Sequence, residues 1–322
     1  MNAALSFLQR VDKERYAAFV ALAILTVVSA LLSPFFLQWQ NLLNIIRQVS
    51  YTGIIALGMT YVIVSGGIDL SVGSMAAFVG CLAILVLNGS FEAGWPEGTA
   101  VAAAVVCAIF AGLACGLANG LLVTKGRIAP FIVTLGTMAL FRSLSLYMAN
   151  AGEFRSASSL FGELGSSAPL GIPLPAFILV GLAAALAFIF GRTRYGRYTR
   201  AVGSNSRVAL YSAIDVDTTR LAAYTLTGAM VGVSAVLIAM RFNSVGSSTL
   251  GVNYELDAIA AVIIGGTSMS GGRGTVWGTV VGAITLGVIN NTLNMVGISP
   301  YLQGTVKGLV IIGAVFIQRQ RQ

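Results

Sequence analysis

The sequence predicts an all-α polytopic membrane protein with about ten transmembrane helices, and two properties support this fold class. Hydrophobic residues make up 57% of the 322 residues and charged residues only 9%, whereas soluble domains carry about 25% charged residues. Apolar runs also recur along the whole chain, most of them near the roughly 20 residues that a helix needs to cross a bilayer. Backbone groups in lipid must form hydrogen bonds internally, which favours a bundle of helices.

Each apolar run is an expected helix, and the whole chain, residues 1–322, is interpreted as a single transmembrane domain. The first run is interpreted as a retained span, because the residues before it are too polar for the start of a signal peptide. The eighth run is short, and glycines interrupt the junction between the second and the third. The runs lie at about 17–33, 42–64, 72–88, 99–123, 130–149, 173–191, 221–242, 256–268, 275–296 and 301–317.

The basic residues gather in alternate loops, and this asymmetry sets the orientation of the chain. With the N-terminus in the cytoplasm, the loops on that side hold 14 of the 19 basic residues. The opposite loops hold four glutamates and a single basic residue, Arg155. Lysine and arginine near membrane segments are retained on the cytoplasmic side, so both termini are predicted to be cytoplasmic. This orientation explains the net charge of +8 better than nucleic-acid binding does.

The interval 192–220, between the sixth and seventh runs, is the most basic part of the chain. Asp215 and Asp217 are its only acidic residues. A cytoplasmic loop of this length, rich in helix-forming residues, indicates a docking surface for a cytoplasmic partner. Its basic residues are Arg192, Arg194, Arg197, Arg200, Arg207 and Arg220.

Glycine spacing and one short internal match bear on how the helices pack. Two G-x-x-x-G-x-x-x-G series begin at Gly112 and Gly274, a spacing that lets two helix backbones approach closely. Segments 116–131 and 287–301 each contain an asparagine followed ten or eleven residues later by a proline. An inverted repeat and a chance match both remain open explanations.

Glycines and polar residues interrupt the apolar pattern at 65–74, where Asp69 or Ser71 is placed to cap the following helix. An interrupted helix exposes polar backbone, which a membrane tolerates only where protein or a water-filled cavity covers it. The segment is therefore either a broken helix that lines a polar path or a plain cytoplasmic turn.

Polar side chains inside the apolar runs are expected to face the interior of the bundle, because polar groups are costly in lipid. Hydrogen bonding between helices is one explanation for them, and a wet path for a solute is the other. Asparagine amides both donate and accept hydrogen bonds, which suits a neutral, hydroxyl-rich solute. The residues predicted to line such a path are Asp69, Ser71, Asn119, Thr134, Asn290, Asn291 and Asn294.

No residue is predicted to be catalytic or to bind a metal. The chain has no histidine and three scattered cysteines, so it lacks the commonest metal ligand and shows neither a disulfide framework nor a zinc site. The glycine-rich segment 271–274 lacks the Walker spacing, and no nucleotide site is predicted on this chain. We therefore expect a protein that is not itself an enzyme.

Three segments resemble the membrane permeases of bacterial sugar importers powered by an ATP-binding cassette, in the ribose-type branch. They are GIDLSVGS at 67–74, YELDAIAAV at 254–262 followed by GGTS at 265–268, and the loop that runs from Gly203 to Val216. The resemblance extends from about residue 20 to the C-terminus. Val208 and Ala213 depart from the usual form of the family's loop.

The resemblance implies the permease subunit of an ATP-driven importer for a monosaccharide, a ribose-like pentose or a hexose, in the bacterial inner (plasma) membrane. It implies a second copy of the permease, forming a homodimer, or a close homologue, together with a periplasmic sugar-binding protein. It also implies a cytoplasmic ATPase that holds ATP and Mg, whereas this chain binds no cofactor. The residues implied for the ATPase-coupling loop are Gly203, Ser204, Asn205, Ser206, Arg207, Val208, Ala209, Ile214 and Asp215.

The alternative function is a stand-alone secondary transporter or channel for a small polar solute. An inverted repeat fits that function equally well. A long basic cytoplasmic loop has no required role in it, however, so the importer is favoured.

Overall fold

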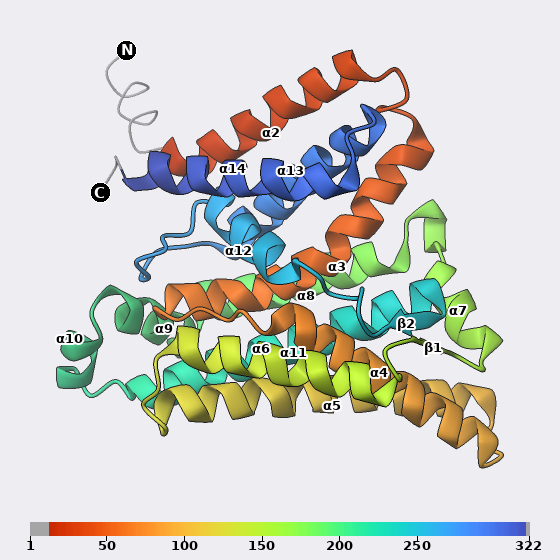
Figure 1. Ribbon diagram of the computed structural model, residues 1–322. Helices are drawn as coiled ribbons and strands as arrows, with labels where there is room; N and C mark the ends of the chain where they lie inside the picture. The colour runs from red at the N-terminus through yellow and green to blue at the C-terminus, as the bar shows by residue number, and fades with distance from the viewer. Residues whose placement is uncertain (1–12, 320–322) are drawn as a thin grey trace.

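The computed structural model describes residues 13–319, which form a bundle of α-helices (Figure 1). The termini 1–12 and 320–322, which the sequence predicts to be cytoplasmic, lie outside the described residues. In chain order the helices are α2 (Lys13–Leu32), α3 (Trp39–Val64), α4 (Val72–Glu92), α5 (Glu97–Thr124), α6 (Pro130–Met148), α7 (Ser159–Ser166), η1 (Pro169–Gly171), α8 (Leu174–Arg192), α9 (Arg194–Ser204), α10 (Ser206–Tyr211), α11 (Val216–Phe242), α12 (Tyr254–Ile264), α13 (Val276–Met295) and α14 (Pro300–Arg319).

Seven helices among the described residues are long and apolar enough to cross a membrane, namely α3, α4, α5, α6, α8, α11 and α13. The all-α membrane class is thereby confirmed, whereas the total of ten crossings remains a prediction. α2 carries a shorter apolar stretch, Ala18–Leu32. The eighth predicted run forms α12, whose 11 residues extend over about 16 Å, roughly half of a 30 Å bilayer core.

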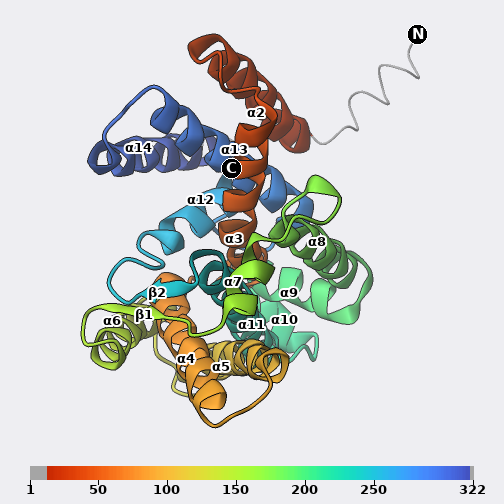
Figure 2. The same cartoon turned by 90° about the vertical axis from the view of Figure 1, so that its right-hand side faces the viewer.

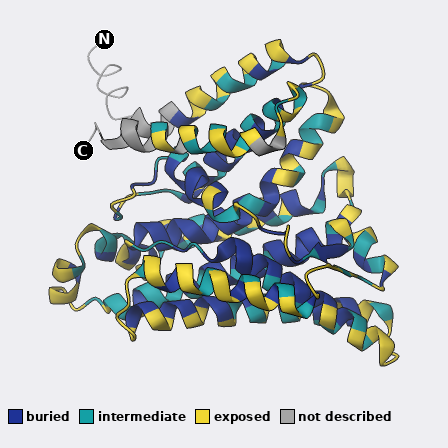
Figure 3. Ribbon diagram, in the orientation of Figure 1, coloured by how far each residue is buried: buried dark blue, intermediate teal, exposed yellow. Residues whose placement is uncertain are grey.

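α3 and α11 form the centre of the bundle, where most of their residues are buried (Figure 3). Tyr61 of α3 and Tyr224 of α11 are completely buried. Their hydroxyls donate hydrogen bonds to the backbone carbonyls of Leu186, at 2.6 Å, and Ile68, at 3.0 Å. Each buried phenol is therefore paired inside the protein, as a low-dielectric interior requires.

The two glycine series pack helices against each other within one chain. A methyl group added at Gly112 of α5 would overlap the carbonyl oxygen of Gly228 on α11, and the reverse substitution would produce the same clash. In the second series, a methyl group at Gly278 of α13 would overlap the carbonyl oxygen of Gly265, directly after α12. Both series thus allow backbones to touch where any side chain would separate them.

The two ends of the bundle are formed by different elements. α9 and α10 lie at one end, together with the start of α2 and the end of α14 (Figure 1). At the opposite end, β1 (Glu153–Arg155) pairs antiparallel with β2 (Ser244–Gly246), close to α7 (Figure 2).

One helix from each half of the chain packs against helices of the other half. α11 packs along α4 and α5, whereas α3 packs along α12 and α13. The turn between α5 and α6 lies at the same end as α10, and the turn between α13 and α14 lies at the other end (Figure 1). An inverted repeat would produce this exchange, and the repeat itself stays a prediction.

Candidate functional site

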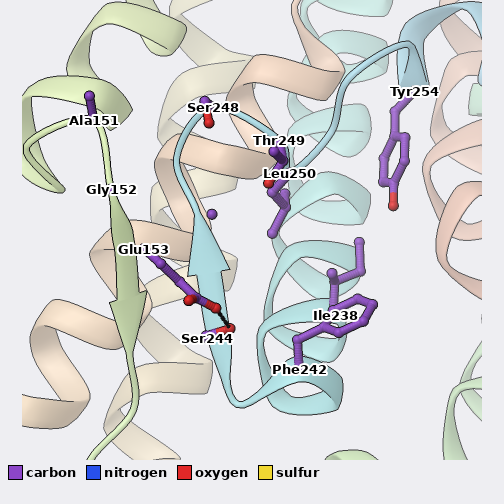
Figure 4. A pocket seen from close by; sticks show the side chains of 11 residues that line it. Ala151, Gly152, Glu153, Ile238, Phe242, Ser244, Ser248, Thr249, Leu250 and Tyr254 are labelled. Atoms are coloured by element: carbon purple, nitrogen blue, oxygen red, sulfur yellow. Dashed lines mark hydrogen bonds between the residues drawn. The ribbon is translucent and has the colours of Figure 1, made fainter. Parts of the chain in front are cut away.

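A cavity of about 580 Å³ opens beside the β1–β2 pair (Figure 4). Glu153 of β1 reaches across to β2, where the Ser244 hydroxyl donates a hydrogen bond of 2.5 Å to its carboxylate. This bond and the neighbouring Arg155 hold the pKa of Glu153 below its usual range. Both polar and apolar groups line the wall, namely Glu153, Ser244, Ser248, Thr249 and Tyr254 together with Ile238, Phe242 and Leu250.

A second, much smaller cavity of about 40 Å³ lies among α3, α12 and α13. Its polar lining consists of Gln48, Thr52, Asp257 and Asn290. Tyr254, the first residue of α12, lines both cavities. We call the larger one, beside the β1–β2 pair, the outer cavity and the smaller one the inner cavity, so one aromatic side chain borders both.

The chain between α11 and α12 runs back into the bundle without forming a helix. Asn243 ends α11 in the left-handed conformation, with φ 50°. Arg142 of α6 then donates hydrogen bonds of 2.7 Å to the carbonyl of Ser247 and 3.0 Å to that of Leu250. Irregular backbone at membrane depth is tolerated where protein satisfies its polar groups, and the guanidinium supplies part of that satisfaction here.

An ion pair fixes α12 to α14. The Lys307 ammonium lies 2.9 Å from one carboxylate oxygen of Asp257 and 3.0 Å from the other. The two side chains are 19% and 12% exposed, respectively. Charged side chains inside membrane segments pair with one another because lipid solvates neither.

Asp69, Ser71 and Asn119 form one completely buried hydrogen-bonded cluster at the break between α3 and α4. Asp69 accepts hydrogen bonds from the Ser71 amide, at 2.9 Å, and the Ser71 hydroxyl, at 2.7 Å. The Asn119 amide donates to the same hydroxyl at 2.8 Å. Ser71 directly precedes α4, but its side chain caps no amide of that helix. The cluster instead ties the break to α5.

The other residues predicted for a path lie in separate places. Thr134 is buried, and its hydroxyl donates to the carbonyl of Pro130 within α6 at 2.9 Å. Asn291 and Asn41 exchange two hydrogen bonds of 2.7 and 3.0 Å between α13 and α3. Asn294 accepts a hydrogen bond of 2.8 Å from Gln303. Of the seven predicted residues, only Asn290 lines either of the two cavities described above.

The basic interval folds into two short helices, α9 and α10. The Asn205 side chain accepts hydrogen bonds from the amides of Arg207, at 3.0 Å, and Val208, at 3.1 Å, and so starts α10. Asp215 caps α11 in the same way through Thr218, and these hydrogen bonds hold the pKa of Asp215 below its usual range.

One face of α10 is open to a partner, whereas its other face is closed. Val208 is 57% exposed and Tyr211 87% exposed, but Ala209 is buried. The amide of Ile214 donates to the carbonyl of Ala209 at 3.0 Å. Ala209 therefore anchors the helix, and its neighbours supply the accessible surface.

Two glycines meet at one backbone carbonyl, that of Val64 at the end of α3. Gly203 lies near the end of α9, and Gly272 lies in the loop between α12 and α13. The Gly272 amide donates to this oxygen at 2.9 Å, and a methyl group at Gly203 would overlap it. Arg220 donates to the next peptide along the chain, at the carbonyl of Ser65, at 3.3 Å. We call Gly203, Val64 and Gly272 the glycine junction.

Several of these features were not predicted from the sequence. The pairing of Lys307 with Asp257 could not be predicted, because 50 positions separate the two residues in the sequence. Tyr254 belonged to a recognised motif, but its position between two cavities depends on the irregular segment before it. Within the described residues, no group of histidine, cysteine, aspartate and glutamate side chains is arranged to hold a metal ion.

The fold combines helices that cross a membrane with a re-entrant segment, polar cavities and an exposed basic segment at one end. This combination defines a transport protein of the permease class. The family described as "Branched-chain amino acid transport system / permease component" matches residues 41–315. The chain belongs to this family.

Curated relatives place the chain in the ribose-type branch of ABC sugar-importer permeases. It is 43% identical to the ribose import permease protein of Bacillus subtilis, over 96% of this chain and 94% of the relative. It is 36% identical to the D-allose transport system permease protein of Escherichia coli, over 95% and 92% of the two chains. The L-arabinose transport system permease protein of Escherichia coli is 32% identical, over 96% and 92%. No solved structure matches.

Proposed function

We propose that this chain forms the membrane path of an ATP-driven importer whose cargo is a monosaccharide. The family description names branched-chain amino acids, whereas relatives aligned over almost the whole chain are named for ribose, allose and arabinose. Hydroxyl and amide groups dominate the polar lining of the two cavities, which suits a neutral polyhydroxylated solute better than a zwitterion.

The orientation proposed here places α9 and α10 in the cytoplasm and the β1–β2 pair on the outside. Arginines crowd the first end, whereas Glu153 and Glu163 belong to the segment between α6 and α8 at the other. This distribution follows the positive-inside rule. Both chain termini would then be cytoplasmic, in a bacterial inner (plasma) membrane.

The partners proposed are a second permease copy or close homologue, a cytoplasmic ATPase and a periplasmic sugar-binding protein. ATP and Mg belong to the ATPase, and this chain contributes no catalytic residue. The single observation that carries the coupling role is the open face of α10, formed around Val208 and Tyr211 on a helix that Asn205 caps. An exposed apolar and aromatic face of this kind fits a protein interface.

The glycine junction offers a route by which motion of α10 reaches the path. Gly203 and Gly272 contact the carbonyl of Val64 without intervening side chains. A displacement of α9 therefore presses on the end of α3 and on the loop between α12 and α13 together. Packed interiors transmit such displacements because they have little free volume.

The seven predicted path residues remain proposals of unequal support. Asn290 has the strongest support because it lines the inner cavity. Asp69, Ser71 and Asn119 are engaged with one another, and a role for them in the path would require this cluster to open during transport.

The docking proposal is tested by placing charge on the open face of α10. Val208→Glu is expected to abolish co-purification of the ATPase encoded with this permease, because a carboxylate would be desolvated at an apolar contact. Leu170→Glu is the matched control, since Leu170 is 93% exposed but lies at the opposite end of the bundle. Equal retention of the ATPase by both variants would refute the docking site.

A further inference from the structure

Two buried oxygen atoms, one on α3 and one on α13, have no hydrogen-bond partner among the described residues, and the second belongs to Asn290, which lines the inner cavity. Asn290 is 8% exposed and its side-chain carbonyl oxygen is unpartnered, and Tyr51 is 6% exposed with an unpartnered hydroxyl. Leaving a buried polar group unpaired costs about 1–3 kcal/mol. Such a group calls for an explanation, and an ordered water molecule or a bound solute is one.

The inner cavity brings together side chains suited to sugar hydroxyls. Asn290 and Gln48 present amides, Thr52 a hydroxyl and Asp257 a carboxylate. Amides both donate and accept, and a carboxylate oxygen accepts from a hydroxyl. Tyr254 adds an aromatic surface with a polar tip.

The one carboxylate that lines the inner cavity is paired with a cation, which favours an uncharged solute. Asp257 is neutralised by Lys307 of α14, so the carboxylate brings no net negative charge to the wall. A neutral hydroxylated molecule loses no ionic solvation on entering such a site.

The inner cavity is closed to a sugar in this structure. Its 40 Å³ is room for about one or two water molecules, whereas the outer cavity measures 580 Å³. Tyr254 borders both cavities, so movement of this side chain would change the boundary of each. Tyr254 follows Asn253, which has φ 65°, so α12 begins directly at the boundary.

We infer that the chamber lined by Gln48, Thr52, Asp257 and Asn290 is a monosaccharide subsite within one permease chain, and that Tyr254 closes it from the outer cavity. This inference rests on the proposed sugar cargo. It adds a selective step in the membrane, after delivery of the sugar. The subsite belongs to α3, α12 and α13 of a single copy.

The subsite is tested by direct binding to the purified permease in lipid nanodiscs, without ATPase or binding protein. Saturation-transfer NMR with D-ribose, D-allose and L-arabinose measures weak binding. The wild-type chain is expected to bind at least one of these sugars, and Thr52→Val and Asn290→Ala are expected to weaken that binding at least tenfold. Thr52→Val is nearly isosteric, so it keeps the test valid if Asn290→Ala folds poorly.

Thr285→Val is the matched control, since Thr285 is buried on α13 and donates only to Val281 of its own helix. It is expected to bind as the wild type does. The inference is overturned if the wild type binds none of the three sugars while the full complex transports one of them, or if all three variants bind equally. A full complex that transports no sugar would instead refute the proposed cargo, which separates the two failures.

Discussion

At the residue scale, opposite charges in α12 and α14 determine how the re-entrant part of the chain is held. Asp257 and Lys307 are separated by 50 positions in sequence and by 2.9 Å in space. Removing one member of a buried pair leaves an uncompensated charge, which costs about 3–5 kcal/mol. Replacing both members by apolar residues removes the charge and its desolvation together.

Lys307→Met is therefore expected to lower the stability of the permease by about 3 kcal/mol. The double variant Lys307→Met with Asp257→Leu is expected to recover most of that loss. Thermal unfolding in detergent, followed by tryptophan fluorescence, measures both variants. A double variant no more stable than Lys307→Met would show that the pair does not act as a unit.

Arg142→Met is expected to free the segment between β2 and α12, since its guanidinium holds the carbonyls of Ser247 and Leu250. Hydrogen exchange measured by mass spectrometry should rise in peptides covering 247–253 and remain unchanged in α5. Arg142→Lys should give an intermediate increase, because an ammonium lacks the planar fork that reaches two carbonyls. Unchanged exchange at 247–253 would contradict this role.

Individual polar residues were predictable from the sequence, whereas their partners were not. An asparagine or aspartate inside an apolar run signals an inward-facing group because lipid excludes it. Which helix supplies its partner depends on the tertiary packing. Asn290 and Asn291 are adjacent in the chain, yet the first lines a cavity and the second pairs with Asn41.

At the scale of elements, the periodic apolar runs predicted the positions of the long helices. The short helices were less predictable, since α12 has the composition of a span and half its length. Its end is set by Gly265 and by the close approach of α13 at Gly278. Such an ending comes from packing, which the apolar pattern does not encode.

Gly203→Ala is expected to separate ATP hydrolysis from transport, because its methyl group would displace α9 from the carbonyl of Val64. ATPase binding should be retained, since the open face of α10 is unaltered. The ratio of sugar imported to ATP hydrolysed in proteoliposomes is expected to fall at least tenfold. Gly191→Ala is the control, as nothing lies within 4 Å of the added methyl group.

A Gly203→Ala variant with a normal transport ratio would show that the glycine junction is only a packing contact. Loss of the ATPase together with transport would point to a misplaced α10 instead. Both outcomes contradict the proposed route of coupling.

At the scale of the whole molecule, the bundle has one basic end with α9 and α10 and one end with the β1–β2 pair (Figure 1). The bias of arginine and lysine predicted a basic segment at α9 and α10, whereas the orientation of the two ends in the membrane stays a prediction. The sequence offered one short internal match for an inverted repeat and did not predict which helices pack together, because glycine-rich apolar sequence also produces such matches by chance. Packing of α13 on α3 and of α5 on α11 is visible only in three dimensions.

The orientation predicts opposite accessibility for two very exposed residues. In a variant without native cysteines, Tyr211→Cys should react with a membrane-impermeant maleimide only in inside-out vesicles. Leu170→Cys should react only from the periplasmic side of intact spheroplasts. Tyr211 is 87% exposed and Leu170 93% exposed. In a permease expressed without its ATPase, which would cover Tyr211, burial would therefore not explain a missing reaction. Labelling of both from the same side would contradict the orientation.

Uptake of labelled D-ribose by proteoliposomes tests the central claim most directly. The vesicles would contain the permease and its ATPase, and the binding protein would be added on the periplasmic face of the permease. ATP would be supplied either inside or outside the vesicles, in separate experiments. The account predicts accumulation that requires ATP on the α10 side and the sugar-loaded binding protein on the other, with D-allose and L-arabinose as comparison cargoes. Accumulation by the permease alone, driven by an ion gradient and independent of the ATPase, would contradict it.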